Sequence, residues 1–139
     1  MKRALLALGS NLGDRQANLA RAIAGLIEQG CEVLQQSSVI ETVPWGTEAP
    51  ERYLNGVVEV RTDLDPWSLL ATTQSVERAL GRTPGARNAP RPMDVDIVAY
   101  EGVTVVSATL TLPHPRLAGR DFVWGPLAEL DIDWFPLRE

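Results

Sequence analysis

The chain carries the stretch RPMDVDIVAY at residues 91–100, and its alternation of acidic and apolar residues predicts a β-strand. Side chains two apart on a strand point to the same face, so Asp94 and Asp96 are expected on one face, about 6.6 Å apart along the chain. Two such carboxylates repel each other and are costly to desolvate unless cations or hydrogen-bond donors approach them. We therefore expect this strand to present an acidic pair to a cation.

Three arginines, Arg82, Arg87 and Arg91, lie in the segment that leads into this strand. Guanidinium groups match phosphate oxygens, and Mg²⁺ prefers a few carboxylates together with waters and phosphate oxygens. The combination predicts a magnesium-phosphate site in which Asp94 and Asp96 are the metal ligands. Two alternatives stay open: the pair is solvated surface, or the arginines only neutralise it, which would explain one arginine better than three.

The 139 residues are expected to form a single domain over 1–139. The net charge of −5 argues against general nucleic-acid binding, and the apolar run at residues 3–8 is too short for a membrane span. The loop GSNLGD at residues 9–14 lacks the Gly-Lys-Ser/Thr of a P-loop kinase. Cys31 is the single cysteine, so an internal disulfide is excluded and a reducing cytoplasm is expected.

Hydrophobic periodicity and capping residues predict the other elements. The first helix is expected to bury Leu19, Ile23, Leu26 and Ile27, and the second, opened by Asp65-Pro66 and closed by Gly81, to bury Trp67, Leu70, Val76 and Leu80. The order predicts an α+β fold, a ferredoxin-like sandwich with one antiparallel sheet, two main helices on one face and a C-terminal extension. Strands are expected at 3–8, 32–41, 53–62, 94–100, 103–106 and 110–112, and helices at 15–28, 66–80 and 120–130.

Two polar residues outside the acidic strand are further site candidates. Asn55 could use its amide to bind the edge of a flat heterocycle; the alternative is a turn or bulge position beside Gly56. His114, the only histidine, lies between two prolines. A lone histidine is usually structural or solvated, and contact with phosphate is the alternative.

Several segments together resemble the 6-hydroxymethyl-7,8-dihydropterin pyrophosphokinase family of folate biosynthesis. They are residues 8–13, 53–55, 90–97 and 110–116, with 120–122. The resemblance implies transfer of pyrophosphate from ATP to the hydroxymethyl group of 6-hydroxymethyl-7,8-dihydropterin, with release of AMP. It also implies two Mg²⁺ ions held by Asp94 and Asp96, small-molecule substrates only, no nucleic-acid or membrane partner, and a monomer.

Site residues carry over by position from this resemblance. Those implied for catalysis are Asp94, Asp96, Arg82 and Arg91. Those implied for pterin binding are Thr42, Pro44, Tyr53, Asn55 and Phe122, with Phe122 stacking on the ring. Those implied for nucleotide binding are Gln74, Glu77, Arg87, Arg91, Ile97, Thr111, His114 and Arg120.

The segment 82–91 departs from the family pattern. Asn88-Ala89 stands where the family often has Trp-Gly, and Pro84 replaces a second loop arginine. One hypothesis is that Trp45 replaces the lost aromatic. The altered segment also motivates an alternative function, a catalytically impaired ATP- or pterin-binding regulator of the same fold. A nucleic-acid or protein interaction module is disfavoured by the acidic charge.

Overall fold

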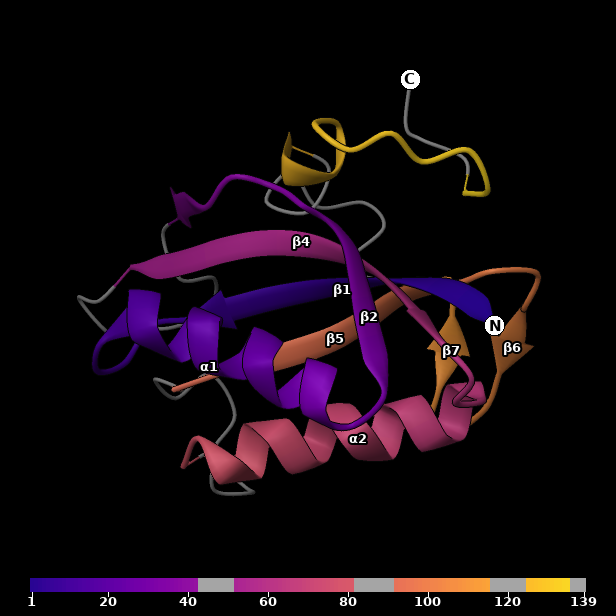
Figure 1. The fold of residues 1–139 in the computed structure, drawn as a ribbon, viewed down its shortest axis with the longest axis horizontal. Helices are drawn as coiled ribbons and strands as arrows, with labels where there is room; N and C mark the ends of the chain where they lie inside the picture. The colour runs from indigo at the N-terminus through magenta and orange to yellow at the C-terminus, as the bar shows by residue number, and fades with distance from the viewer. Residues whose placement is uncertain (43–51, 82–91, 116–124, 136–139) are drawn as a thin grey trace.

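The computed structural model describes residues 1–42, 52–81, 92–115 and 125–135. Its main sheet has strand order β2-β4-β1-β5, with β3 beside β4, and every pairing is antiparallel (Figure 1). Its strands are β1 (Lys2–Ser10), β2 (Cys31–Gln36), β3 (Ile40–Thr42), β4 (Tyr53–Thr62) and β5 (Asp94–Tyr100). A separate pair, β6 (Val105–Val106) and β7 (Thr111–Leu112), follows β5. The prediction of a strand in the acidic stretch is therefore confirmed, and the structure places this strand, β5, beside β1 at the edge of the sheet.

The single strand predicted over 32–41 is wrong, because the structure divides it into β2 and β3. At the break, the Ser37 hydroxyl accepts a hydrogen bond from the Val57 backbone at 2.8 Å and donates to the Ser38 carbonyl at 2.8 Å. The Ser37 side chain thus replaces a backbone acceptor for β4 at this point, and the edge of the sheet bends there. Gly56 lies opposite, where a Cβ atom would be 3.5 Å from the Ser37 hydroxyl.

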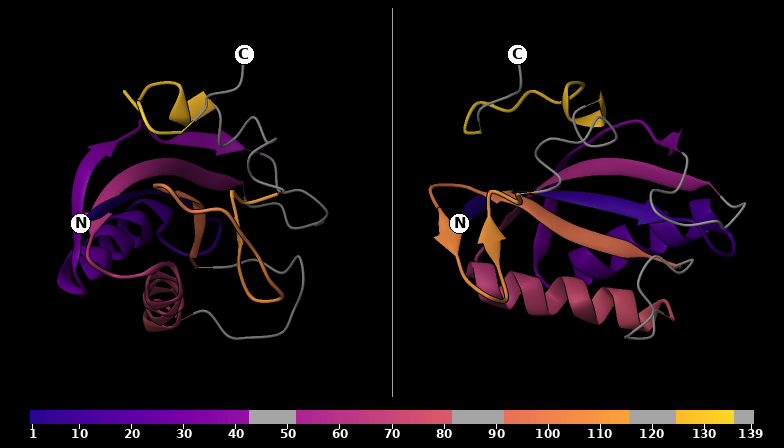
Figure 2. Two further views of the ribbon diagram at one scale, coloured as in Figure 1. Left: turned by 90° about the vertical axis from the view of Figure 1, so that its right-hand side faces the viewer. Right: turned by 180° about the vertical axis from the view of Figure 1, so that it is seen from behind.

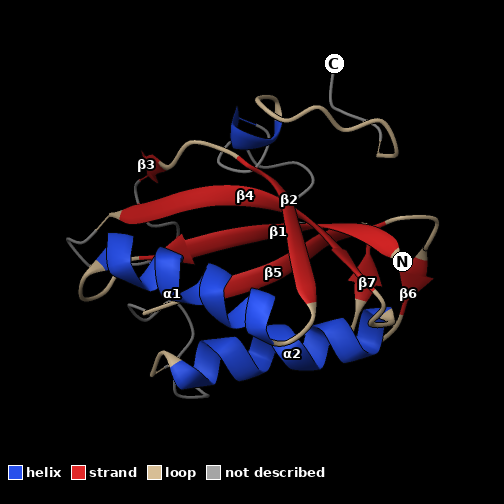
Figure 3. Ribbon diagram, in the orientation of Figure 1, coloured by secondary structure: helices blue, strands red, loops and turns tan. Residues whose placement is uncertain are grey.

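Both helices cover one face of the sheet (Figures 2 and 3). Helix α1 (Arg15–Glu28) is capped by Asp14, and α2 (Pro66–Ala79) is capped by Asp65, whose carboxylate accepts from the Ser68 backbone at 2.8 Å. That bond and one from the Ser68 hydroxyl lower the pKa of Asp65. The predicted helix starts are thus confirmed, and each is stabilised by a local cap.

Two residues predicted to be buried on these helices are exposed. Trp67 is 49% exposed and Ile27 is 53% exposed, whereas α2 buries Leu69, Thr73 and Val76 against the sheet. The cap at Asp65 sets where α2 begins, and packing against the sheet selects the stripe through Leu69 and Val76. The prediction for Trp67 was therefore wrong, because the apolar residues of α2 allow two neighbouring orientations of the helix about its axis and the sequence pattern does not choose between them.

On the opposite face of the sheet, the described residues form a second, smaller core. It is an apolar cluster formed by the strands and the C-terminal segment 125–135: Leu5, Ala7, Val57, Val98, Ala99, Leu127, Leu130 and Ile132. Glu59 fastens this segment, accepting from Gln35 at 2.8 Å and from the Trp134 indole at 2.7 Å. Among the described residues, no helix is long and apolar enough to cross a membrane.

Candidate active site

The middle of the candidate site is Gly9, where three strands lie side by side. Gly9 faces Asn55 of β4 on one side and Asp94 of β5 on the other, and two residues earlier Ala7 faces Asp96. Facing residues of an antiparallel sheet share a face, so Asn55, Asp94 and Asp96 project to the same side. That side is the one away from the helices, because the alternate residues Leu8 and Val95 belong to the helix-side core.

The acidic strand divides its side chains between two environments. Val95 and Ile97 are both 3% exposed and are anchored in the helix-side core, whereas Asp94 and Asp96 are half-buried. The apolar residues thus hold the strand while the carboxylates project from the face opposite the helices. This arrangement follows directly from the alternation in the sequence.

Glu77 of α2 lies against the outer edge of the acidic strand. Its carboxylate accepts a hydrogen bond from the Val95 backbone at 2.8 Å, and Glu77 is 9% exposed. Among the described residues β5 is the outer strand, so the Glu77 carboxylate takes the place of a neighbouring strand as acceptor for this backbone N–H. Glu77 was predicted to contact nucleotide, and the structure places it beside the strand segment between Asp94 and Asp96. Gln74, one turn earlier on α2, is exposed.

On the other side of Gly9, Asn55 and Tyr53 come together with Thr42. The Asn55 amide donates to the Thr42 hydroxyl at 2.6 Å, and β3 pairs Thr42 with Tyr53. A Cβ atom added at Gly9 would lie 3.1 Å from Asn55 Oδ1 and 3.4 Å from a Tyr53 ring carbon. Asn55 lies inside paired strand β4, so the turn or bulge alternative for it is wrong.

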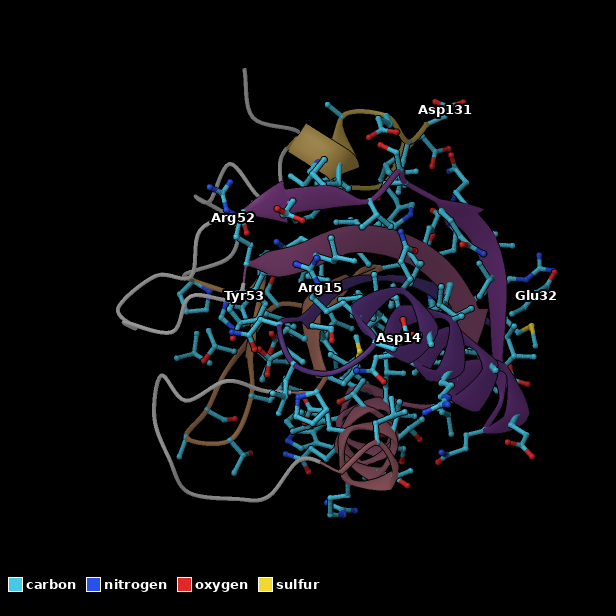
Figure 4. All side chains as sticks on the ribbon, turned by 90° about the vertical axis from the view of Figure 1, so that its left-hand side faces the viewer. Asp14, Arg15, Glu32, Arg52, Tyr53 and Asp131 are labelled. Atoms are coloured by element: carbon cyan, nitrogen blue, oxygen red, sulfur yellow. The ribbon has the colours of Figure 1, made fainter. Side chains whose placement is uncertain are left out.

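Figure 4 shows this end of the molecule, with Tyr53 at the start of β4 and Asp14 at the start of α1. Arg15 joins the two elements, since its guanidinium donates to the Arg52 carbonyl at 2.5 Å and to Glu41 at 3.2 Å. The first turn of α1 is therefore tied to the residue that precedes Tyr53.

A pocket of about 350 Å³ lies beside β5 on the side of α2, within the range of sizes that hold small molecules. Four predicted site residues border it: Asp96, Ile97, Thr111 and His114. The His114 backbone donates to the Val98 carbonyl at 2.8 Å, which holds the segment after β7 against the strand. Asp96 borders this pocket and also projects to the face that carries Asn55, so the acidic pair lies between the pocket and Asn55.

Sequence reasoning missed several residues of this site. Leu70 and residues 107–110 also border the pocket, and Asn18 holds the loop after β1. Leu70 was assigned to the core by its apolar character, and nothing in the sequence distinguishes the two roles. The remaining predicted residues, Pro44, Arg82, Arg87, Arg91, Arg120 and Phe122, lie outside the described residues, as do Trp45 and Pro84.

The donor set around Asp94 and Asp96 fits a hard divalent cation shared with a ligand. No cluster of three or more His, Cys, Asp or Glu side chains in the described part of the chain could hold a metal ion. Two carboxylates leave most of an octahedral shell to water and ligand oxygens, which is the usual binding of Mg²⁺ with substrate phosphates. The aspartate pair therefore suits a metal that arrives with a polyphosphate.

The family model for 7,8-dihydro-6-hydroxymethylpterin-pyrophosphokinase (HPPK) matches residues 5–132. The 2-amino-4-hydroxy-6-hydroxymethyldihydropteridine pyrophosphokinase of Bacillus subtilis is 43% identical over 128 residues, which are 91% of this chain and 77% of that protein. The enzyme of the same name from Methylorubrum extorquens is 43% identical over 134 residues, 96% of this chain and 85% of its own.

Solved structures share the fold. Wild-type HPPK-DHPS of Plasmodium falciparum with SDX-DHP matches 89% of this chain and 39% of its own, with a TM-score of 0.62 and 14% identity. HPPK-DHPS in complex with substrates matches 93% of this chain and 40% of its own, with a TM-score of 0.68 and 14% identity. The extent of the family match and the identity to its relatives lead to one conclusion: this chain belongs to the 7,8-dihydro-6-hydroxymethylpterin-pyrophosphokinase family.

Proposed function

We propose that this protein transfers pyrophosphate from ATP to the hydroxymethyl group of 6-hydroxymethyl-7,8-dihydropterin, with release of AMP, as a step of folate biosynthesis. The observation that carries the proposal is the position of Asp94 and Asp96, between Asn55 and the pocket beside β5. Membership of the family and relatives named as pyrophosphokinases support it. Such a transfer depends mainly on positioning two substrates and neutralising charge.

Asp94 and Asp96 would hold magnesium, and two ions are proposed. Bound there with the triphosphate, the metal supplies charge neutralisation and orients the phosphate oxygens. The residues of the chain provide the rest: the strand presents the carboxylates, and Arg82 and Arg91 are proposed to neutralise the moving pyrophosphate as catalytic residues. The half-buried position of both aspartates supports this role.

The pterin is proposed to bind on the Asn55 side of the acidic pair. The Thr42 hydroxyl accepts one N–H of the Asn55 amide, which orients the carbonyl oxygen and the second N–H for the edge of a heterocycle. Tyr53 and Pro44 would line the same side, and Phe122 would stack on the ring. The half-buried Tyr53, packed over Gly9, supports an aromatic wall here.

The nucleotide is proposed to occupy the pocket on the other side of the pair. Ile97, Thr111 and His114 border it, and an apolar strand residue beside polar groups suits a flat base with a polar edge. The other nucleotide contacts proposed are Gln74, Glu77, Arg87, Arg91 and Arg120. This placement puts the triphosphate between the pocket and the pterin hydroxyl.

The proposal extends to the whole molecule. The strand order β2-β4-β1-β5, with both helices on one face, supports a ferredoxin-like sandwich in a single domain over 1–139. We also propose a monomer acting in the cytoplasm on small-molecule substrates. No observation on the described residues favours the alternative of an impaired regulator.

The test is incubation with ATP, Mg²⁺ and the hydroxymethyl dihydropterin, followed by chromatography of the products. AMP and a pyrophosphorylated pterin are expected, and ADP in place of AMP would contradict the proposal. Binding of both ligands without AMP would support the regulator instead.

Asp94→Asn and Asp96→Asn are each expected to lower kcat by at least about 100-fold, because a neutral amide is a weaker Mg²⁺ ligand than a carboxylate. Asp63→Asn is the control, since this aspartate is 80% exposed and pairs only loosely, at 3.6 Å, with the N-terminus. Full activity of the double variant of Asp94 and Asp96 would refute the metal assignment.

A further inference from the structure

Asn18, in the first turns of α1, joins two chain segments beside the candidate site. Its side-chain nitrogen lies 3.3 Å from the Ser10 hydroxyl, 2.9 Å from the Leu12 carbonyl and 3.2 Å from the Pro92 carbonyl, and it donates to all three. An amide has two N–H groups, so one hydrogen is shared between two oxygens. Asn18 is 8% exposed, which makes these bonds expensive to lose.

The three acceptors flank the two halves of the site. Ser10 follows Gly9, the residue between Asn55 and Asp94. Pro92 comes two residues before Asp94 and 74 positions after Asn18 in the sequence. One side chain therefore connects the end of β1 to the start of β5, beside the proposed pterin and metal positions.

The backbone hydrogen-bond ladder between β1 and β5 ends close to the Asn18 side chain. Among the described residues, the last pair that joins β1 to β5 at this end is Gly9 with Asp94. Beyond that pair, the Asn18 amide bonds to Ser10 and Leu12 on one side and to Pro92 on the other, and so connects the end of β1 to the residues just before β5. Asp94 lies at the very end of the ladder, so its position depends on this support more than that of Asp96, which is inside it.

Asn18 is itself held firmly by the start of α1. The Asp14 carboxylate caps the helix by accepting from the Ala17 backbone at 3.1 Å, and the Asn18 backbone donates to the Asp14 carbonyl at 2.9 Å. Gly13 turns the chain with φ +74°, and a Cβ atom there would lie 3.8 Å from the Asn18 amide nitrogen. The amide thus extends from a capped helix end, so its position relative to the two segments that it joins is fixed.

We propose that Asn18 is a positioning residue for the pyrophosphate transfer: it sets the distance between Asp94 and the Asn55 side of the site. This inference rests on the proposed function. Loss of the amide donors frees residue 92 and its neighbours to shift relative to β1, which moves the Asp94 carboxylate. The pocket and Asn55 keep their own supports, so both substrates still bind, but their reacting groups are misaligned.

The test compares Asn18→Leu, which keeps the approximate size of the side chain and removes its donors, with Thr62→Val. Thr62 is a matched control because it is also buried and also bridges two segments, donating to the Gly30 carbonyl at 2.9 Å and accepting from the Leu64 backbone at 3.1 Å. It lies at the opposite end of β4 from Tyr53. Both variants remove a buried bridge, and only one is beside the site.

Asn18→Leu is expected to lower kcat by about 10- to 100-fold and to raise the Mg²⁺ concentration for half-maximal rate, with both KM values within about twofold of wild type. Thr62→Val is expected to lower the unfolding temperature to a similar degree while keeping kcat and the Mg²⁺ requirement. If kcat and the Mg²⁺ requirement of Asn18→Leu match those of Thr62→Val, Asn18 is only structural and the inference is overturned.

A second variant covers the case in which Asn18→Leu does not fold. In Asn18→Ser the hydroxyl oxygen is one bond closer to the backbone than the amide nitrogen of asparagine. The serine side chain is therefore expected to be too short to reach the Pro92 carbonyl, and it is small enough to fit the helix. The same loss of kcat at unchanged KM is expected, and wild-type kcat would overturn the inference. Failure of the proposed function is a separate result, because the wild-type protein would then release no AMP.

Discussion

At the residue scale, Gly9 lies beneath Asn55 and Tyr53, the two described side chains proposed to contact the pterin that lie nearest to it. Its lack of a side chain lets Asn55 and Tyr53 pack over the strand, and the acidic strand lies directly on its other side. A glycine that ends an apolar run is readily taken for a simple strand terminator. The structure shows that it also makes space for two side chains from the neighbouring strand.

Gly9→Ala is expected to raise KM for the dihydropterin by about three- to tenfold, or about 0.7–1.4 kcal/mol of binding free energy. The added methyl group would lie 3.1 Å from Asn55 Oδ1, so the amide must shift from its orientation. KM for ATP is expected to change little. Gly56→Ala is the control in the adjacent strand, since its Cβ atom would make only ordinary contacts, the nearest at 3.5 Å. Equal effects of both variants would contradict the prediction.

At the element scale, α2 and β5 are coupled by Glu77. Burying a carboxylate on a helix is unusual unless it has partners, and the Val95 backbone supplies one at 2.8 Å. The bond joins the helix to the strand that carries the aspartates. Periodicity places Glu77 on a polar side of the helix, and only the position of β5 reveals that this side faces a strand edge.

Glu77→Leu is expected to lower the free energy of unfolding by about 1–3 kcal/mol, because the Val95 N–H is left without this acceptor in a buried position. Glu77→Gln keeps an acceptor oxygen and is expected to lose less. Urea denaturation of both variants and the wild type measures the difference. Equal stability of Glu77→Leu and wild type would show that the bond contributes nothing net.

At the scale of the whole molecule, Arg3 holds three distant parts of the chain together. Its guanidinium pairs with Glu101 at 2.8 Å and with Asp133 at 2.9 Å, and lies 5.9 Å from the centre of the Trp134 ring. Hydrogen bonds from Arg3 lower the pKa of Glu101 from its usual 4.5 to about 2, and the Glu101 and Asp133 carboxylates raise the pKa of Arg3. The first strand, the turn after β5 and the C-terminal segment thus share one ion-pair cluster.

This cluster predicts a pH dependence of stability. The pKa of Glu101 is lower in the folded than in the unfolded protein, so its stabilisation is complete above about pH 4.5 and disappears as pH falls toward 2. Glu101→Gln is expected to lose stability at pH 7 and to show a smaller decline between pH 4.5 and 2 than wild type. Partial exposure and salt reduce the effect.

Denaturant unfolding at several pH values, at low and at high salt, measures this dependence. Glu28→Gln, at the exposed end of α1, is the control and is expected to follow wild type. A wild-type pH profile in the Glu101 variant would exclude this pair as its source.

Local chemistry in the sequence determined most elements. Asp14 and Asp65 cap their own helices, and Gly30 and Gly81 end them with φ values of +107° and +95°, so α1 and the start of α2 are predictable without the rest of the chain. The alternation around Asp94 determined the strand and the common side of its carboxylates. Resemblance in several segments of the sequence is sufficient to indicate the family.

Tertiary structure alone decided which faces and neighbours these elements have. The break between β2 and β3 depends on Val57 and Gly56 across the sheet, the exposure of Trp67 depends on how α2 packs, and the links from Asn18 to Pro92 and from Glu77 to Val95 join residues far apart in sequence. A sequence pattern encodes local conformation and periodicity. Contacts between distant segments depend on strand order and register, which arise only when all the apolar surfaces are buried together.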